Sequence, residues 1–366
     1  FFKVVYRRHT NFSMEAIEQT WNGSDTTNGR CTATISRNGD LVHRMYLEIT
    51  YGTSSADLKK DNPGASLITD VELEIGGQKI DKHSGHWMET WAELTEPNHA
   101  ALVALNTTQN GTLFQNMSGM GGVDANSTGA AGDGAKLFVP LQFWFCRNPG
   151  LALPLIALQY HEVKVILEHK MLDAIGNGTN QLWADYIYLD TDERRRFAQV
   201  SHEYLIEQVQ EQSLATGNGS KELNFNHPVK ELIWSQKAAK VGAEQGSTLK
   251  PISSGTGTFK LTLNGHDRFA ARDWRYFSRT QVWQHHSGPG GLLSGDAGGG
   301  KLDDSIGVYS FALKPEEHQP SGTCNFSRID NAQFVASGAS NADAIFAVNY
   351  NVLRIMSGMG GLAYSN

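Results

Sequence analysis

The stretch NPGLALPLIALQYHEVKVIL (148–167) and the stretch KPEEHQPSGTCNFSRIDNAQF (314–334) share a proline skeleton although only the first is rich in apolar residues. In each, two prolines stand five residues apart, with aromatic residues at the same distances on either side. Since the chain holds only 10 prolines, chance is a poor explanation, and the pattern indicates an internal duplication. The pairs, which share one offset in residue number, are Phe143 with Tyr309, Phe145 with Phe311, Pro149 with Pro315, Pro154 with Pro320, Tyr160 with Phe326 and Val163 with Ile329.

Earlier segments pair at a second offset. VELEIGG (71–77) aligns with FKLTLNG (259–265), and DLVHRMY (40–46) aligns with PVKELIW (228–234), both at an offset of 188. The offset then falls from 188 to 166, so the second copy is shorter between the two blocks, in the interval that holds the glycine-rich loop 106–135 of the first copy. The chain is therefore predicted to be two tandem copies of one unit.

Period-two alternation predicts that each unit is built from strands. In VELEI, Val71, Leu73 and Ile75 face one way and the two glutamates face the other, which is typical of a half-buried antiparallel strand. Helix is expected at SGHWMETWAEL (84–94), with Ser84 as N-cap, at EPNHAALVALN (96–106) and at DWRYFSRTQVW (273–283). The other predicted strands lie in LVHRMYLEITY, LITDVELEIGG, KLFVPLQFWF, YHEVKVILE, LWADYIYLD, FKLTLNG and NYNVLRIM.

These patterns predict an all-β fold of two tandem eight-stranded antiparallel jelly-roll β-sandwiches, a double jelly roll, with a few short helices in loops. We expect the first jelly roll over 1–190, a linker over 191–203 and the second jelly roll over 204–366. The contrast in apolar content gives a further expectation. Leu151 to Leu158 is predicted to be buried against a neighbouring subunit or domain, and Glu316 to Ser321 to face solvent.

Composition narrows the classes of function. The net charge is −7, and the one basic run, DERRRF (192–197), is interspersed with acids, so it is interpreted as a solvated face or an ion-pair cluster rather than a nucleic-acid surface. The three cysteines lack CxxC spacing, which argues against a disulfide framework or a structural zinc site. No signal peptide and no apolar run long enough for a transmembrane helix is visible.

A search for catalytic or metal-binding residues finds no convincing set. His83 and His86 lie three residues apart near Asp81, but no third ligand has clear spacing. His161 and Glu162 fall on opposite faces of a strand, and the pair at 285–286, in a glycine-rich loop, is expected to be exposed to solvent. We predict no enzyme activity, no cofactor and no metal.

The chain is unusually rich in Asn-x-Ser/Thr sequons. Nine occur, where about three are expected from the content of asparagine, serine and threonine. Either an outer surface carries glycans, or loops made of these residues generate sequons automatically, and the sequence leaves both open. Asn11 and Asn325 lie in apparent core motifs and are poor acceptors. The candidate attachment sites are Asn106, Asn110, Asn116, Asn126, Asn177 and Asn218.

Seven motifs, in order along nearly the whole chain, carry a resemblance to a known family. The chain resembles the major capsid proteins of nucleocytoplasmic large DNA viruses, most of all the algal-virus (phycodnavirus) type. The motifs are FFKVVYRRHTNF, ISRNGDL, DVELEIGGQKIDKH, PGLALPLIALQYHEV, FNHPVKELIW, QPSGTCNFSRIDN and NYNVLRIMSGMGGLAYSN.

The resemblance implies a structural protein that forms pseudo-hexagonal homotrimeric capsomers tiling an icosahedral shell. It implies location in the virion, assembly in the host cytoplasm, an N-terminal arm of about two dozen residues before the FFK motif, and minor capsid and penton proteins as partners. An internal viral membrane is expected nearby, and no direct contact with nucleic acid. The alternative from another class is a carbohydrate-binding or carbohydrate-active jelly roll, in which the tryptophans of HWMETWAEL (86–94) stack on sugars.

Overall fold

The fold is known from a computed structural model, and its description covers most of the chain. The described residues are 2, 11–50, 62–96, 102–104, 110–121, 136–171, 178–237, 251–288, 290, 292–293, 301–302 and 304–364.

Strands dominate these residues, and the helices are short and lie in the connections. The strands are β1 (Phe12–Gln19), β2 (Trp21–Gly23), β3 (Gly29–Thr34), β4 (Leu41–Thr50), β5 (Ile68–Ile75), β6 (Gln78–Ser84), β7 (Leu102–Ala104), β8 (Asn110–Thr112), β9 (Lys136–Pro140), β10 (Leu153–Pro154), β11 (Val163–His169), β12 (Thr179–Leu189), β13 (His202–Ser213), β14 (Gly219–Glu222), β15 (Pro228–Ser235), β16 (Thr258–Leu263), β17 (His266–Asp273), β18 (Leu292–Leu293), β19 (Lys301–Leu302), β20 (Ile306–Ser310), β21 (Cys324–Asn325), β22 (Ala332–Ser337), β23 (Ala344–Met356) and β24 (Met359–Leu362). The helices are α1 (Pro63–Ser66), α2 (Gly85–Thr95), α3 (Leu113–Ser118), α4 (Trp144–Arg147), the 3₁₀ turn η2 (Pro149–Leu151), α6 (Thr191–Gln199), the π-helix η3 (Tyr276–Thr280), α8 (Gln281–His285) and the 3₁₀ turn η4 (Phe326–Arg328).

Both halves of the chain have jelly-roll topology. Eight strands of the first half, counted in chain order, form two sheets in the orders 1-8-3-6 and 2-7-4-5. These sheets are β1-β12-β4-β9 and β3-β11-β5-β6, with β10 and β2 added to them. The second half repeats both orders, as β13-β23-β15-β20 and β14-β22-β16-β17, with β21 and β24 added.

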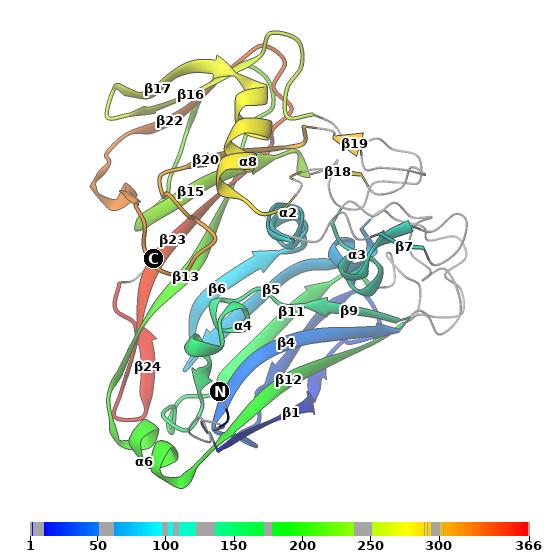
Figure 1. The fold of residues 1–366 in the computed structure, drawn as a ribbon, viewed down its shortest axis with the longest axis vertical. Helices are drawn as coiled ribbons and strands as arrows, with labels where there is room; N and C mark the ends of the chain where they lie inside the picture. Colours follow the sequence, from blue (N-terminus) through cyan, green and yellow to red (C-terminus); the bar gives the residue numbers. More distant parts are fainter. Residues whose placement is uncertain are drawn as a thin grey trace.

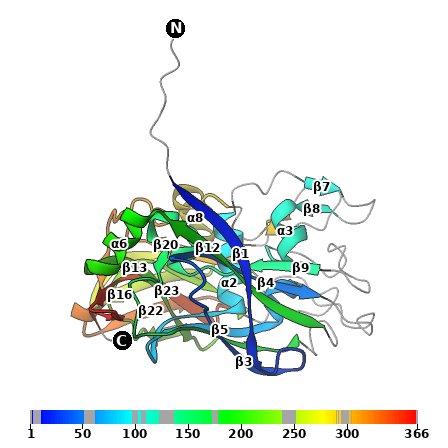
Figure 2. The same cartoon turned by 90° about the horizontal axis from the view of Figure 1, so that it is seen from below.

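The two sandwiches are stacked along the long axis of the molecule. Figure 1 shows them one above the other, with α2 between them. Figure 2 shows β1 along the outside of the first sandwich, where it pairs with β12 at the edge of its sheet. The predicted double jelly roll is therefore confirmed.

The pairing of strands identifies which residues of the two copies are equivalent. Val71, Leu73 and Ile75 occupy the places of Phe259, Leu261 and Leu263, because each set pairs in the same way with the seventh strand of its own copy. The predicted offset of 188 is therefore correct for β5 and β16.

For β4 and β15 the predicted offset is wrong by one residue. Val42 pairs with Tyr186, and Val229 pairs with Asn349. Val229 is therefore the equivalent of Val42, at an offset of 187 between the third strands of the two halves. Asn349 is the equivalent of Tyr186, at an offset of 163 between the eighth strands. A one-residue slip moves every side chain to the other face of the sheet, so the corrected register decides which residues correspond.

The proline skeleton identifies the right connection but the wrong register. Val163 pairs with Ile75, and Ala332, rather than Ile329, pairs with the equivalent Leu263. The offset there is 169 instead of 166, because three residues that form η4 lengthen the second connection before its strand.

The apolar stretch Leu151–Leu158 is buried, as predicted, except that Leu151 and Ile156 are half-buried. Leu158 contacts Gly360 of β24, so part of the covering surface comes from the other half of the same chain. In the matching stretch, Glu317, Gln319 and Pro320 are exposed as predicted. The prediction is wrong for Glu316, His318 and Ser321, which are half-buried, Glu316 for reasons given below.

Two of the three expected helices occur. Ser84 caps α2 by accepting a hydrogen bond from the backbone of Trp87, and 274–285 is helical. The helix predicted over 96–106 is wrong at 102–104, which form β7, and 97–101 and 105–106 lie outside the described residues. The helix α4 replaces the end of the strand predicted in KLFVPLQFWF. The expected linker contains α6, with Asp190 as its N-cap.

All three cysteines are unpaired thiols, two of them buried. Burial raises the pKa of Cys31 and of Cys146 to about 12, and raises that of half-buried Cys324 as well. Within the described ranges, no helix is long and apolar enough to cross a bilayer.

Candidate functional site

The junction between the two sandwiches is the most elaborate polar site among the described residues. At its centre lies α2, which follows the edge strand β6 of the first sandwich. Ten of its eleven residues are buried, because one face covers its own sandwich and the other lies against the sheet of β15 and β23. The imidazole of His86 lies 2.8 Å from the hydroxyl of Ser235, and the ring of Trp87 packs 5.1 Å from that of Phe346. The two sandwiches thus share one continuous core.

The edge strands extend this junction. The backbone N–H of Val209 on β13 donates to the carboxylate of Asp81 on β6 at 3.1 Å, and the hydroxyl of Ser84 donates to Glu211 at 2.6 Å. The side-chain amide of Gln208 donates to the backbone carbonyl of Ile80.

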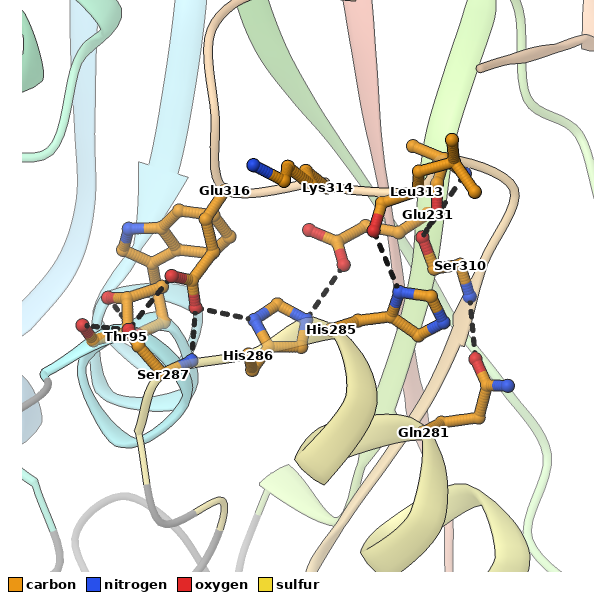
Figure 3. A network of polar contacts seen from close by, with 12 residues as sticks. Thr95, Glu231, Gln281, His285, His286, Ser287, Ser310, Leu313, Lys314 and Glu316 are labelled. Carbon is orange, nitrogen blue, oxygen red and sulfur yellow. Dashed lines mark hydrogen bonds and ion pairs between the residues drawn. The ribbon is translucent and has the colours of Figure 1, made fainter. Parts of the chain in front are cut away.

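A histidine held between two glutamates anchors the segment after α8 (Figure 3). His286 lies 2.8 Å from Glu231 and 3.0 Å from Glu316, and its side chain is inaccessible to solvent. Burial alone would lower the pKa of His286, but the charges and hydrogen bonds of the two carboxylates raise it to about 9. The histidine is therefore charged at neutral pH. The predicted exposure of the pair at 285–286 to solvent is wrong, because His286 is buried and His285 is half-buried.

The same cluster reaches the first sandwich through the next residue. The hydroxyl of Ser287 lies within hydrogen-bond distance of the Glu316 carboxylate, at 2.8 Å, and of the backbone carbonyl of Thr95, at 3.0 Å. The backbone N–H of Gly288 donates to the carbonyl of Leu94 at 2.8 Å. The half-burial of Glu316 follows from these contacts. The cluster closes the C-terminal end of α2 onto the second sandwich.

A second ionic cluster crosses the junction at Glu207 of β13. Its carboxylate accepts hydrogen bonds from Lys230 and from Arg147 of α4, each at 2.7 Å. Burial alone would raise the pKa of Glu207, but Arg147, His318 and Lys230 lower it to about 2. Lys230 has no solvent-accessible side-chain surface, so its charge depends on this partner.

Beside this cluster lies a cavity of about 780 Å³, lined by residues of both sandwiches that include Trp91, Arg147, Glu207 and His318. Four carboxylates line this cavity: Glu207 is held ionised by its cations and Glu316 by His286, whereas burial raises the pKa of Glu96 and of Asp185. Trp87 and Trp91, which the carbohydrate hypothesis placed against sugars, are 2% and 4% exposed and pack on one another.

The other candidate residues are scattered. His83 binds Asp81 at 2.9 Å, whereas His86 faces Ser235, and the described residues contain no group of three or more side chains suited to a metal ion. His161 lies within hydrogen-bond distance of the backbone of Gly360 in β24, at 2.9 Å, while the neighbouring Glu162 is exposed.

The six candidate glycan sites fall into two groups. Asn218 is exposed in a turn, Asn116 is half-buried in α3 with its amide donating to the Thr112 carbonyl, and Asn110 begins β8. Asn106, Asn126 and Asn177 lie outside the described residues.

Raising the pH should loosen the junction through His286. A group whose pKa is raised by folding contributes stability that is complete below its ordinary value of 6.5 and is lost as pH rises through about 9. We expect the free energy of unfolding to fall by up to about 3 kcal/mol between pH 6.5 and 9.5. Urea denaturation at several pH values measures this, and His286→Asn should flatten that part of the profile. An unchanged slope in the variant would contradict the assignment.

Two sandwiches of identical jelly-roll topology, fused through a shared core, define the class of double jelly-roll proteins. Residues 1–190 match the family model described as the N-terminus of the major capsid protein, and 193–361 match the model of the large eukaryotic DNA virus major capsid protein. The chain belongs to this family of major capsid proteins.

Individual relatives agree with this assignment. The chain is 51% identical to the major capsid protein of Pyramimonas orientalis virus, covering 100% of this chain and 94% of the relative. It is 38% identical to that of Paramecium bursaria Chlorella virus 1, covering 100% and 94%. A quasi-atomic model of the PBCV-1 capsid superposes with a TM-score of 0.77 at 37% identity, over 100% of both chains. The protein is thus a structural component of a viral capsid rather than an enzyme, and the carbohydrate-active alternative gains no support.

Proposed function

We propose that the chain self-associates into a homotrimer, and that this pseudo-hexagonal capsomer tiles the icosahedral shell of a large double-stranded DNA virus. The supporting observation is the duplication. Because both halves repeat the strand orders 1-8-3-6 and 2-7-4-5, three chains supply six similar units, enough for a hexagonal outline. The units are residues 1–190 and 204–366, with 191–203 as the linker.

The partners in this proposal are further copies of the chain, minor capsid and penton proteins, and an internal membrane lying nearby. The chain makes no direct contact with nucleic acid, in line with its net charge of −7. Assembly takes place in the host cytoplasm. The sequons, among them exposed Asn218, mark the surface that would carry glycans.

Size-exclusion chromatography with light scattering tests the first step of the proposal. We expect the purified chain to elute at three times its monomer mass of 40.2 kDa and to show a hexagonal outline by negative-stain microscopy. A monomer at all accessible concentrations would overturn the proposed self-association.

A further inference from the structure

The sheet face that α2 covers in the second sandwich has a counterpart in the first. The strand registers make Ile233, Ser235 and Phe346 equivalent to Tyr46, Glu48 and Trp183. The first three are completely buried under α2. Their counterparts are only half-buried, although Tyr46 and Trp183 form a stacked aromatic pair with ring centroids 6.4 Å apart. This face of the sheet is therefore fully covered in the second sandwich and only partly covered in the first.

The helix α2 also has a counterpart. The segment 274–285, which comprises η3 and α8, follows β17 just as α2 follows β6. One side of it is buried, with Phe277 in the core of the second sandwich and Val282 in the core that the two sandwiches share. Its other side carries Arg275, Arg279 and Trp283, and the guanidinium of Arg279 binds Asp304 of the same sandwich. All three are exposed, Trp283 by 81%. An indole so far out of contact is unusual, since aromatic residues concentrate in cores and interfaces.

The edge strands of the two sandwiches also come in equivalent pairs, and in the pair that is left exposed one strand carries arginines and the other carries glutamates. Within the chain, β6 and β13 lie side by side and are joined by hydrogen bonds. Their counterparts are β17 and β1, whose residues are mostly exposed. Exposed Arg268 and Arg272 lie on β17, whose exposed Asp267 and Asp273 pair with Lys260 and Arg275 of the same chain. Exposed Glu15 and Glu18 lie on β1. Opposite charges on the two strands favour their approach in the way that complementary interfaces do.

We propose that helix 274–285 of one copy docks on the Tyr46–Glu48–Trp183 face of a second copy, in the place that α2 takes within each chain. The inference rests on the proposed self-association and identifies its seam. Arg275 and Tyr276 are the second and third residues of helix 274–285, as His86 and Trp87 are the second and third residues of α2. We therefore treat Arg275 as the equivalent of His86 and Tyr276 as the equivalent of Trp87. Arg275, which lies 3.6 Å from Asp273 of its own chain, therefore meets Glu48 of the next copy, which pairs with Lys136 of its own chain, where His86 meets Ser235. Tyr276 packs on Trp183 where Trp87 meets Phe346.

This contact is heterologous, because each copy offers one sheet face and one helix to different neighbours. Heterologous contacts close into a ring when the rotation between copies allows it. In such a ring the junction within a chain alternates with the junction between chains, and three copies place six sandwiches in equivalent surroundings.

Mixed disulfide cross-linking tests the seam. One preparation carries Glu48→Cys and the other Arg275→Cys, and the two are dissociated, mixed and reassembled under mild oxidation. We expect a covalent dimer on a non-reducing gel from the mixture and from neither variant alone, which also controls for the native cysteines. The double variant in one chain should give covalently closed trimers.

Substitutions provide the second measurement. Arg275→Glu and Trp283→Ala should each raise the concentration at which the trimer dissociates by at least about tenfold, since central interface residues carry most of the binding energy. Combining Arg275→Glu with Glu48→Arg should restore part of that loss. The matched control is Arg328→Glu, a charge reversal at another exposed arginine of the same sandwich. Circular dichroism confirms that the variants are folded.

The outcomes separate the two proposals. A wild-type chain that remains monomeric overturns the self-association itself. A wild-type trimer that forms no mixed cross-link and is unaffected by Arg275→Glu and Trp283→Ala overturns only the seam. Cross-linking of the mixture, with weakening that Glu48→Arg reverses, supports both.

Discussion

Replacing Glu207 by glutamine is expected to destabilise the protein by about 3–5 kcal/mol, because it leaves the ammonium group of Lys230 charged and buried without its partner. The side chains of Lys230 and Glu207 are 0% and 4% exposed, and their contact is 2.7 Å long. The substitution also leaves one acceptor oxygen in place of two for Lys230 and Arg147, and the contact of Arg147 ties the first sandwich to the second. Thermal and urea denaturation measure the loss.

The same strand offers a matched control. Glu203 pairs with Arg354 at 2.7 Å, but both side chains are more than half exposed, so Glu203→Gln should cost no more than about 1 kcal/mol. Adding Lys230→Met to Glu207→Gln removes the buried, unpaired ammonium group and should recover much of the stability. Equal losses for Glu207→Gln and Glu203→Gln would show that burial does not control the energy of the Glu207 cluster.

The second large effect is expected from Trp234→Ala, which should cost about 3–5 kcal/mol by leaving a cavity in the second sandwich. Trp234 is 1% exposed, and its ring lies 5.0–5.5 Å from those of Phe259, Phe277 and Phe334. Gly307 lies against the indole so closely that even a Cβ there would meet it at 2.4 Å. The cavity therefore has little freedom to collapse.

Far-ultraviolet circular dichroism is the suitable measurement, since it does not depend on the tryptophan that is removed. Leu313→Ala serves as control, because that leucine is 77% exposed and its truncation should change the free energy of unfolding by no more than about 0.5 kcal/mol. A loss below about 1 kcal/mol for Trp234→Ala would contradict the packing described for this core.

The sequence predicts the duplication and the jelly-roll class because strands and turns leave local patterns. At β5 and β16 the register is also right, since alternating side chains and the tight turns after them, GG at 76–77 and NG at 264–265, fix the alignment. At β15 the alternation is lost, because all its residues after Pro228 are buried. A strand buried on both faces gives no signal that distinguishes a one-residue slip.

The candidate site is harder to predict because it is built from distant parts of the chain. His286 meets Glu231, 55 residues away, and α2 of the first sandwich meets Phe346, close to the end of the second. A loop histidine beside glycines resembles an exposed residue, and nothing local indicates its two carboxylate partners. The strong helix pattern around Ser84 is the one signal of the junction, and it predicts the helix without predicting what covers it.

The buried thiols have a consequence for the life of the particle outside the cell. A capsid passes from a reducing cell interior into an oxidising medium, where accessible thiolates form sulfenic acids and mixed disulfides. With pKa values of about 12, Cys31 and Cys146 hold almost no thiolate near neutral pH, and burial keeps oxidants away from their sulfur atoms. We therefore expect these two thiols to stay reduced when the particle leaves the reducing cell interior.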